Sequence, residues 1–191
     1  MSSAMKTKAF TLIELIVAMG IFAFAATFAV ASLLALTGAQ RKAAATQNAF
    51  DNVRYALDFM AKETREAKTI VNQCENGDEP DFMCNILILV RGTNSNDIVR
   101  YEWKKDVDGN ITYLERRETI NGTALSSYPL TDSRIKINHA SFYISNAGST
   151  GDNFQPYVIF VINATAGDPN KPSEQSTIHL QTAASLWRLD I

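Results

Sequence analysis

Residue types that interrupt helices or bind metals are scarce in this chain of 191 residues. No proline occurs before Pro80, so no proline breaks a helix in the first part of the chain. Only two cysteines and two histidines are present. Cys74 and Cys84 lack the further Cys or His that tetrahedral zinc requires, while His139 and His179 have no acidic partner at a matching spacing. The sequence therefore predicts no metal site.

The sequence also lacks the short motifs of common enzymes. It contains no Gly-x-Ser-x-Gly, no phosphate-binding loop and no dinucleotide-binding fingerprint. Residues 106–110 read Asp-Val-Asp-Gly-Asn, but an EF-hand has its glycine sixth and a glutamate twelfth, whereas here the glycine comes fourth. A hairpin turn explains this segment better. We therefore expect no catalytic residues, no cofactor and no enzymatic activity.

Charge of neither sign is in large excess. The formal net charge is −2, and the basic residues are scattered along the chain. A broad nucleic-acid-binding surface needs a clear positive balance, so no nucleic-acid partner is predicted. A small DNA-binding patch is compatible with this net charge.

A long apolar run dominates the N-terminal part of the chain. It covers residues 10–36 and contains one charged side chain, Glu14. A helix of more than about 20 apolar residues spans a bilayer, whereas a secretory signal has an apolar region of only about 7–15 residues. Residues 1–9, which precede the run, are polar and basic. We therefore expect a removable leader peptide at 1–9 and one transmembrane helix at 10–38.

Residues 8–29 closely resemble the N-terminal signature of type IV prepilins and of the pseudopilins of type II secretion, with a small residue before Phe10 and Thr-Leu-Ile-Glu after it. In that family prepilin peptidase cuts on the cytoplasmic side, just before the phenylalanine, and methylates the new N-terminus. The resemblance implies cleavage between Ala9 and Phe10 and N-methylation of Phe10, although the family usually has glycine where this chain has Ala9. It also implies a bacterial inner-membrane protein with a cytoplasmic N-terminus and a periplasmic or extracytoplasmic C-terminal domain.

Glu14 needs an explanation because a charge at membrane depth costs about 2.5 kcal/mol or more. In a helix Glu14 lies four residues, about 6 Å, beyond Phe10. A neighbouring subunit staggered along the helix axis could therefore bring its cleaved, cationic N-terminus to this carboxylate, and each charge would offset the desolvation of the other. We expect this pairing to direct subunit assembly. The alternative is that Glu14 lies near the lipid headgroups and reaches water.

Residues 39–71 change to an amphipathic pattern. Apolar or small residues recur there every three or four positions, which places them on one face of a helix. They are Phe50, Val53, Leu57, Met60, Thr64, Ala67 and Val71. The transmembrane helix is therefore predicted to continue, to about 60 residues in all, with this face packed against its own domain.

Residues 72–191 are predicted to form a globular antiparallel β domain. After a loop at 72–85, strand-like patterns occur at 86–90, 98–104, 111–118, 135–145, 157–163 and 177–189. The predicted fold is α+β, a long N-terminal helix packed on an antiparallel sheet of about five to seven strands. Type IV pilins have this architecture. If the domain is exported, Cys74 and Cys84 can form a disulfide, and two reduced thiols are the alternative.

The leading hypothesis is a structural subunit, a minor pilin or minor pseudopilin, of a type IV pilus or a type II secretion pseudopilus. Its partners would be prepilin peptidase, other pilin or pseudopilin subunits and the membrane. The size of the chain and the segments at 17–22, 180–182 and 186–188 are similar to J-type pseudopilins or W-type minor pilins. A competence role with DNA stays open. The alternative is a single-pass membrane-tethered extracytoplasmic binding module or enzyme that does not polymerise.

Overall fold

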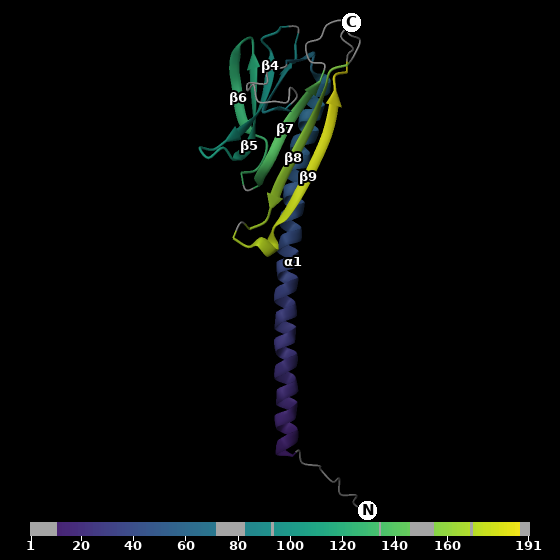
Figure 1. Ribbon diagram of the computed structural model, residues 1–191, viewed down its shortest axis with the longest axis vertical. Helices are drawn as coiled ribbons and strands as arrows, with labels where there is room; N and C mark the ends of the chain where they lie inside the picture. The colour runs from purple at the N-terminus through teal and green to yellow at the C-terminus, as the bar shows by residue number, and fades with distance from the viewer. Residues whose placement is uncertain are drawn as a thin grey trace, which may run out of the picture. The chain divides into compact units, whose positions relative to one another are not determined.

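The computed structural model describes residues 11–71, 83–92, 94–133, 135–145, 155–168 and 170–187 (Figure 1). The chain divides into two compact units, Met1–Arg41 and Lys42–Ile191.

Helix α1 covers Leu12–Glu66 and contributes to both units. Thr11 precedes its first turn, and the Oγ1 atom of Thr11 accepts a hydrogen bond of 3.3 Å from the backbone N–H of Glu14. This bond satisfies one of the N–H groups that a helix leaves unpaired at its start. The predicted first helical residue, Phe10, lies outside the described residues.

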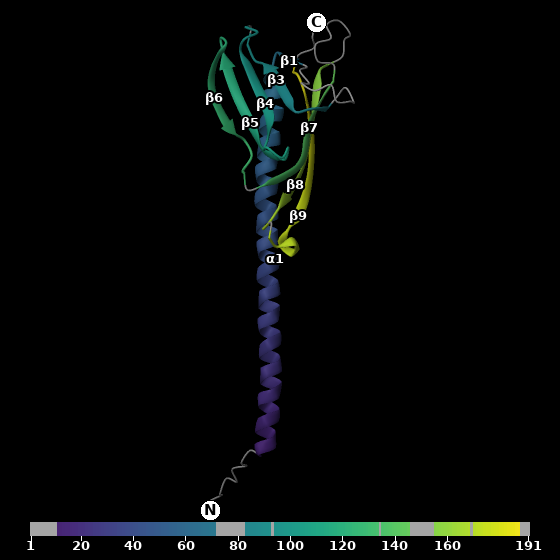
Figure 2. The ribbon, with the colours of Figure 1, turned by 60° about the vertical axis from the view of Figure 1, so that its left-hand side comes forward.

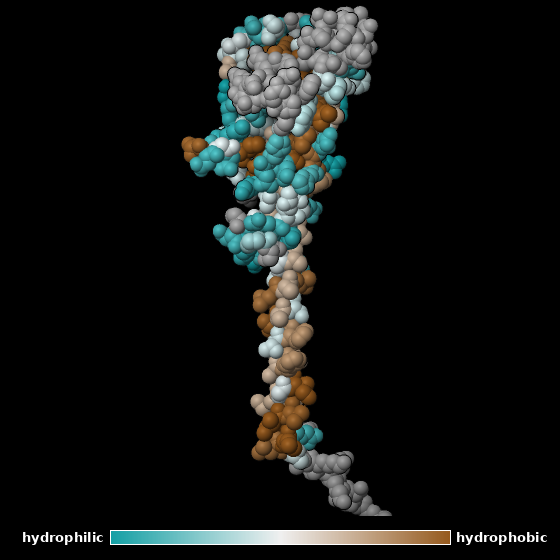
Figure 3. All heavy atoms as spheres, viewed as in Figure 1, coloured by the Kyte–Doolittle hydropathy of each residue, from teal (hydrophilic) through white to brown (hydrophobic). Residues whose placement is uncertain are grey.

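The first unit shows its apolar side chains to the surroundings (Figure 3). Phe22 is 74% exposed and Phe24 is 71% exposed, and the most apolar stretch of α1 has no buried residue. By length and composition this helix is able to cross a membrane. Within the described chain, nothing covers this surface.

The helix ends at Glu66, before the end of the amphipathic pattern at Val71. The next β-branched residues form strand β1, Thr69–Val71, which pairs with β3, Ile86–Val90. Lys68 begins this change of structure, since its backbone N–H donates to the carbonyl of Val90 at 2.7 Å. Pairing with the sheet therefore decides the conformation of a segment whose spacing also fits a helix.

The described residues contain nine strands, all paired antiparallel in one sheet (Figures 1 and 2). The strands after β1 and β3 are β2 (Met83–Cys84), β4 (Ile98–Lys105), β5 (Ile111–Ile120), β6 (Thr123–Pro129), β7 (Lys136–Ser145), β8 (Tyr157–Ala166) and β9 (Ser176–Ser185), and a 3₁₀ turn, η1, covers Pro172–Glu174. The order is β1-β3-β4-β5-β7-β8-β9, with β2 on β7 and β6 on β5. The predicted α+β architecture is confirmed. The predicted five to seven strands are too few because β1, β2 and β6 were not recognised.

The core of the second unit lies between the second half of α1 and one face of the sheet. Val53 and Met60 of α1 are fully buried, as are Tyr101 of β4, Phe142 of β7 and Phe160 of β8. The ring of Phe142 meets that of Phe160 edge-on, with 6.0 Å between centroids. The predicted amphipathic face is therefore the face that packs on the sheet from Val53 to Thr64, whereas Phe50, which was predicted to lie on it, is 37% exposed.

Two turns show how local sequence sets the pairing of β4, β5 and β6. In the turn after β4, Oδ1 of Asp106 accepts hydrogen bonds from the backbone N–H groups of Asp108 and Asn110, as expected for the predicted hairpin. Between β5 and β6, Asn121 and Gly122 both have positive φ, 52° and 78°. This is the two-residue turn that Asn-Gly favours, and it joins β5 to β6.

Candidate functional site

Glu14 lies on the apolar surface of the first unit, in the first turn of α1. Its backbone N–H is held by Thr11, while its side chain has no partner among the described residues. Thr11 and Glu14 also have the spacing of a capping box, in which a glutamate three positions after the cap stabilises the helix start. The carboxylate is therefore available to a group from outside the described chain.

The residues of the predicted cleavage site, Ala9 and Phe10, lie outside the described residues. Cleavage and N-methylation at this bond stay predictions. Cys74 also lies outside, so its pairing with Cys84 stays a prediction. Cys84 itself is buried in β2.

A second glutamate of α1, Glu63, has the opposite surroundings. Its side chain is buried between the helix and the sheet, and Arg116 of β5 holds it with two hydrogen bonds, of 2.7 Å to Oε1 and 3.1 Å to Oε2. The hydroxyl of Tyr101 donates to the same carboxylate. Arg91 lies 3.3 Å from Oε1 and also pairs with Glu118, which accepts from Arg116. This Glu63 cluster connects α1 to strands β4 and β5.

The Glu63 cluster shifts the acidity of its members. Burial alone would raise the pKa of Glu63, but hydrogen bonds from Arg116 and Tyr101 and the charges of Arg116 and Arg91 bring it below the ordinary value of 4.5. Burial and the bond to Glu63 raise the pKa of Tyr101 well above 10.0. Glu63 is therefore ionised and Tyr101 neutral at neutral pH. The arrangement is a structural ion pair between the helix and the sheet.

Sequence reasoning missed the Glu63 cluster. Glu63 follows Met60 by three residues, so it falls on the buried face of the helix, and Arg116 alternates with Leu114 on the inward face of β5. These two positions were the available signal, because a buried acid needs a buried base. Their partnership across 53 residues only appears once the strands are in place.

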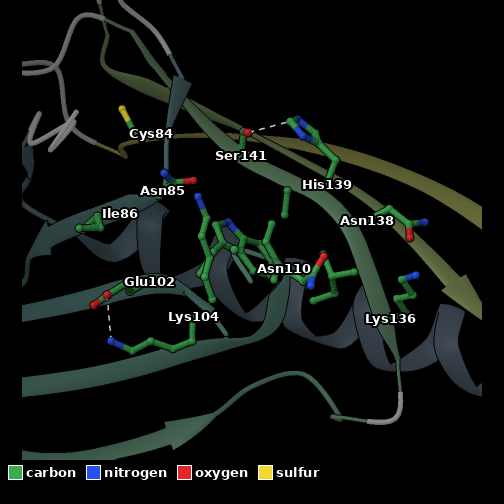
Figure 4. Close-up of a pocket in the computed structure, with 16 residues that line it drawn as sticks. Cys84, Asn85, Ile86, Glu102, Lys104, Asn110, Lys136, Asn138, His139 and Ser141 are labelled. Carbon is green, nitrogen blue, oxygen red and sulfur yellow. Dashed lines mark hydrogen bonds and ion pairs between the residues drawn. The ribbon is translucent and has the colours of Figure 1, made fainter. Parts of the chain in front are cut away.

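An open cleft of about 900 Å³ lies in the sheet of the second unit, between β7 and the strands β2, β4 and β5 (Figure 4). Lys104, Lys105 and Lys136 line it together with one carboxylate, Glu102. The carboxylate of Glu102 forms an ion pair with the ammonium group of Lys104, 2.8 Å away. His139 and Ser141 also line the cleft, 3.3 Å apart. His179 is exposed on β9, and the described residues contain no cluster of acids, cysteines and histidines that fits a metal.

The N-terminal part of the chain matches a known protein family. Residues 4–30 match the family model described as prokaryotic N-terminal methylation motif, and the motif includes Glu14 and the first turns of α1. No curated protein and no solved structure matches the chain.

This motif marks the chain as a type IV prepilin-like protein. The long apolar helix and the antiparallel sheet give it a pilin-like α+β architecture. The motif and the uncovered apolar surface of α1 together indicate that the chain is anchored in a membrane through its N-terminal part.

Proposed function

We propose that this chain is a structural subunit, a minor pilin or minor pseudopilin, of a type IV pilus or a type II secretion pseudopilus. The observation that carries the proposal is the coincidence of the methylation motif at 4–30 with an apolar helix surface that the described chain leaves uncovered. Such a surface needs lipid before assembly, and in a filament it needs other helices of the same kind. The N-terminus faces the cytoplasm and the second unit lies outside the inner membrane.

Processing precedes assembly in this proposal. Prepilin peptidase cleaves between Ala9 and Phe10 and methylates Phe10. The freed amino group is a cation close to the membrane, and the Glu14 carboxylate of an adjacent subunit is its partner. Pairing the two charges offsets the desolvation of each, so the pair selects one axial register between neighbouring helices.

The role is structural rather than enzymatic. The buried ionisable groups of the second unit, Glu63, Tyr101 and Arg116, bind one another. The cysteines Cys74 and Cys84 form a disulfide that closes the segment between β1 and β2. This disulfide closes a loop around residues 75–83, and such a covalent link reduces the entropy of the unfolded chain.

The N-terminus of the mature protein tests the proposal. The protein is purified from native membranes, and its first peptide is sequenced by mass spectrometry. We expect a peptide that begins with Phe10 and carries one added methyl group, and the Phe10→Ala variant serves to confirm the assignment of the methylated residue.

A functional protein that keeps residues 1–9, or that is cut after the apolar run, contradicts the proposal. That result would favour a single-pass tether for an extracytoplasmic module. A second measurement, immunogold labelling of sheared filaments, separates a processed subunit that assembles from one that stays in the membrane.

A further inference from the structure

The cleft lies where the strands of the sheet are incompletely paired. β7 is paired with β8 along its length, apart from an irregularity at Asn138. On its other side it meets β5 only at Ile137 and β2 only at Phe142 and Tyr143. Within the described chain, residues 138–141 have no strand beside them on that side. Figure 4 shows Asn138, His139 and Ser141 following one another along this open edge.

An open strand edge binds extended peptide. Its backbone N–H and C=O groups are unpaired, and a segment that lies alongside completes the ladder. Four residues of strand extend about 13 Å. The cleft of about 900 Å³ beside this edge leaves room for a short segment with its side chains.

The charged side chains that line the cleft favour a bound segment that carries negative charge. Of the three lysines that line it, Lys104 is bound to Glu102 at 2.8 Å and to Glu115 at 3.1 Å. Lys105 and Lys136 are exposed and have no carboxylate partner among the described residues. These two lysines lie at the same end of the cleft, because Lys105 pairs with Ile111, and Ile111 pairs with the residue after Lys136.

The floor of the cleft offers a further donor. Trp103 is 3% exposed and stacks on Phe142 with 5.7 Å between ring centroids. Its indole Nε1–H has no acceptor in the described part of the chain. A buried donor without an acceptor is uncommon in folded proteins. The nitrogen is closed to solvent.

We propose that this cleft binds an extended, carboxylate-bearing segment of a partner protein. The segment adds alongside residues 138–141 of β7 and places its carboxylate between Lys105 and Lys136. The backbone edge supplies the direction of binding, and the two ammonium groups supply the preference for an acidic residue or a chain terminus. The inference does not depend on whether the chain is a filament subunit.

Peptide binding to the full chain in detergent micelles tests the proposal. The probe is a fluorescently labelled, C-amidated decapeptide of alternating Thr and Glu, and its counterpart has Gln for every Glu. Fluorescence anisotropy is expected to show binding of the Glu peptide about tenfold tighter than the Gln peptide. Absence of charge-dependent binding up to about 1 mM peptide overturns the proposal.

Matched variants locate the binding. Lys105→Gln with Lys136→Gln is expected to weaken the Glu peptide about tenfold, since both charged donors are lost. Lys62→Gln with Lys171→Gln makes the same change of net charge outside the cleft and is expected to leave the affinity within about twofold. Equal losses in the two double variants would mean general attraction to positive charge and overturn the assignment.

Three further measurements separate the remaining occupants. A Glu peptide with alternate backbone N-methyl groups is expected to bind about tenfold more weakly, because strand addition needs its N–H groups. Unchanged affinity would mean that the peptide binds without strand addition, and this result, like full displacement by inorganic phosphate, would overturn the proposal. Binding that appears only after Glu75, Asp78, Glu79 and Asp81 are changed to their amides would assign the cleft to the chain itself.

Tryptophan emission gives an independent readout. The chain has two tryptophans, so Trp187→Phe leaves Trp103 as the reporter under the cleft. The Glu peptide is expected to change the emission of this variant over the concentration range seen by anisotropy. Binding without any change at Trp103 would place the peptide elsewhere and overturn the proposal.

Discussion

Glu14 and Glu63 lie on the same helix, and their surroundings show how the two units of the chain differ. Glu63 has Arg116 and Tyr101 of the sheet around it, together with Arg91, which follows β3 in the same unit. Glu14 lies among exposed apolar side chains, and its carboxylate has no partner in the described chain. The second unit therefore satisfies its buried charge by folding. The first unit leaves its charge to be satisfied by something else, namely lipid headgroups, water or another subunit.

The largest expected effect is on filament assembly. It tests whether the Glu14 carboxylate is paired by a neighbouring subunit. Glu14→Gln removes the charge but keeps a residue that is able to serve in a capping box. We expect membrane insertion and folding of the second unit to be unchanged and incorporation into filaments to be lost. Immunoblots of sheared filaments and of membranes measure the two outcomes.

Asp51→Asn is the control for that variant, because it removes an exposed carboxylate from the same helix in the second unit. It is expected to assemble normally. Normal incorporation of Glu14→Gln would show that pairing with a neighbouring N-terminus does not direct assembly.

The next effect is on the stability of the second unit. Glu63→Ala removes the carboxylate that accepts two hydrogen bonds from the buried Arg116 and leaves this arginine with Glu118, so the free energy of unfolding is expected to fall by about 3 kcal/mol. Denaturant titration of the full chain in micelles, followed by near-ultraviolet circular dichroism, measures this loss. The double variant with Arg116→Ala is expected to lose little more than either single variant, because one change already breaks the pair.

Asp58→Ala is the matched control. Its carboxylate lies 3.6 Å from Arg54 on the exposed face of the same helix, so its loss is expected to cost no more than about 0.5 kcal/mol. If both variants had the same stability, the Glu63 cluster would not be what holds α1 to the sheet.

A smaller effect compares apolar residues of the two units. Met60 is fully buried against the sheet, and Met60→Ala is expected to lower the free energy of unfolding by about 2 kcal/mol or more. Phe22→Ala removes a larger side chain that is 74% exposed in the first unit, and it is expected to leave the stability of the second unit unchanged. A loss from Phe22→Ala equal to that from Met60→Ala would contradict the division into two units.

The smallest effect is the dependence of stability on pH. The pKa of Glu63 is lower in the folded chain than its ordinary value of 4.5. Its contribution is therefore complete above about pH 4.5 and is lost as the pH falls through the folded-state value. Denaturant titrations at decreasing pH are expected to show a steeper loss in the native chain than in Glu63→Gln. Parallel curves would mean that Glu63 does not titrate with folding.

Strands with an alternating or continuous apolar pattern were predictable, and those without one were not. The apolar run at 86–90 has the bounds of β3 itself. β6 was missed because all its residues are exposed, so its sequence has no alternation. The Asn-Gly turn before it was the local signal that would have revealed it. β1 was included in the helix because the position of Val71 fits the helical spacing as well as it fits a strand.

The sequence predicted the candidate site whose residues are close together in the chain. It missed the sites whose residues come from several helices and strands. Glu14 lies inside the motif at residues 4–30, so these residues were sufficient to predict its role, which stays a prediction. The Glu63 cluster joins residues from α1, β4 and β5. The cleft is lined by β2, β4, β5 and β7. No spacing along the chain encodes such combinations.

The sequence by itself determined the membrane helix, its single acidic residue and the prepilin-like start of the chain, because these depend on composition and short spacing. It also determined that a helical face and an alternating sheet would pack together. Only the tertiary structure decided which strand edges stay open and which charges meet in the core. Those outcomes depend on the pairing of strands far apart in the chain, which brings Glu63 to Arg116 and, among the described residues, leaves one side of residues 138–141 without a paired strand.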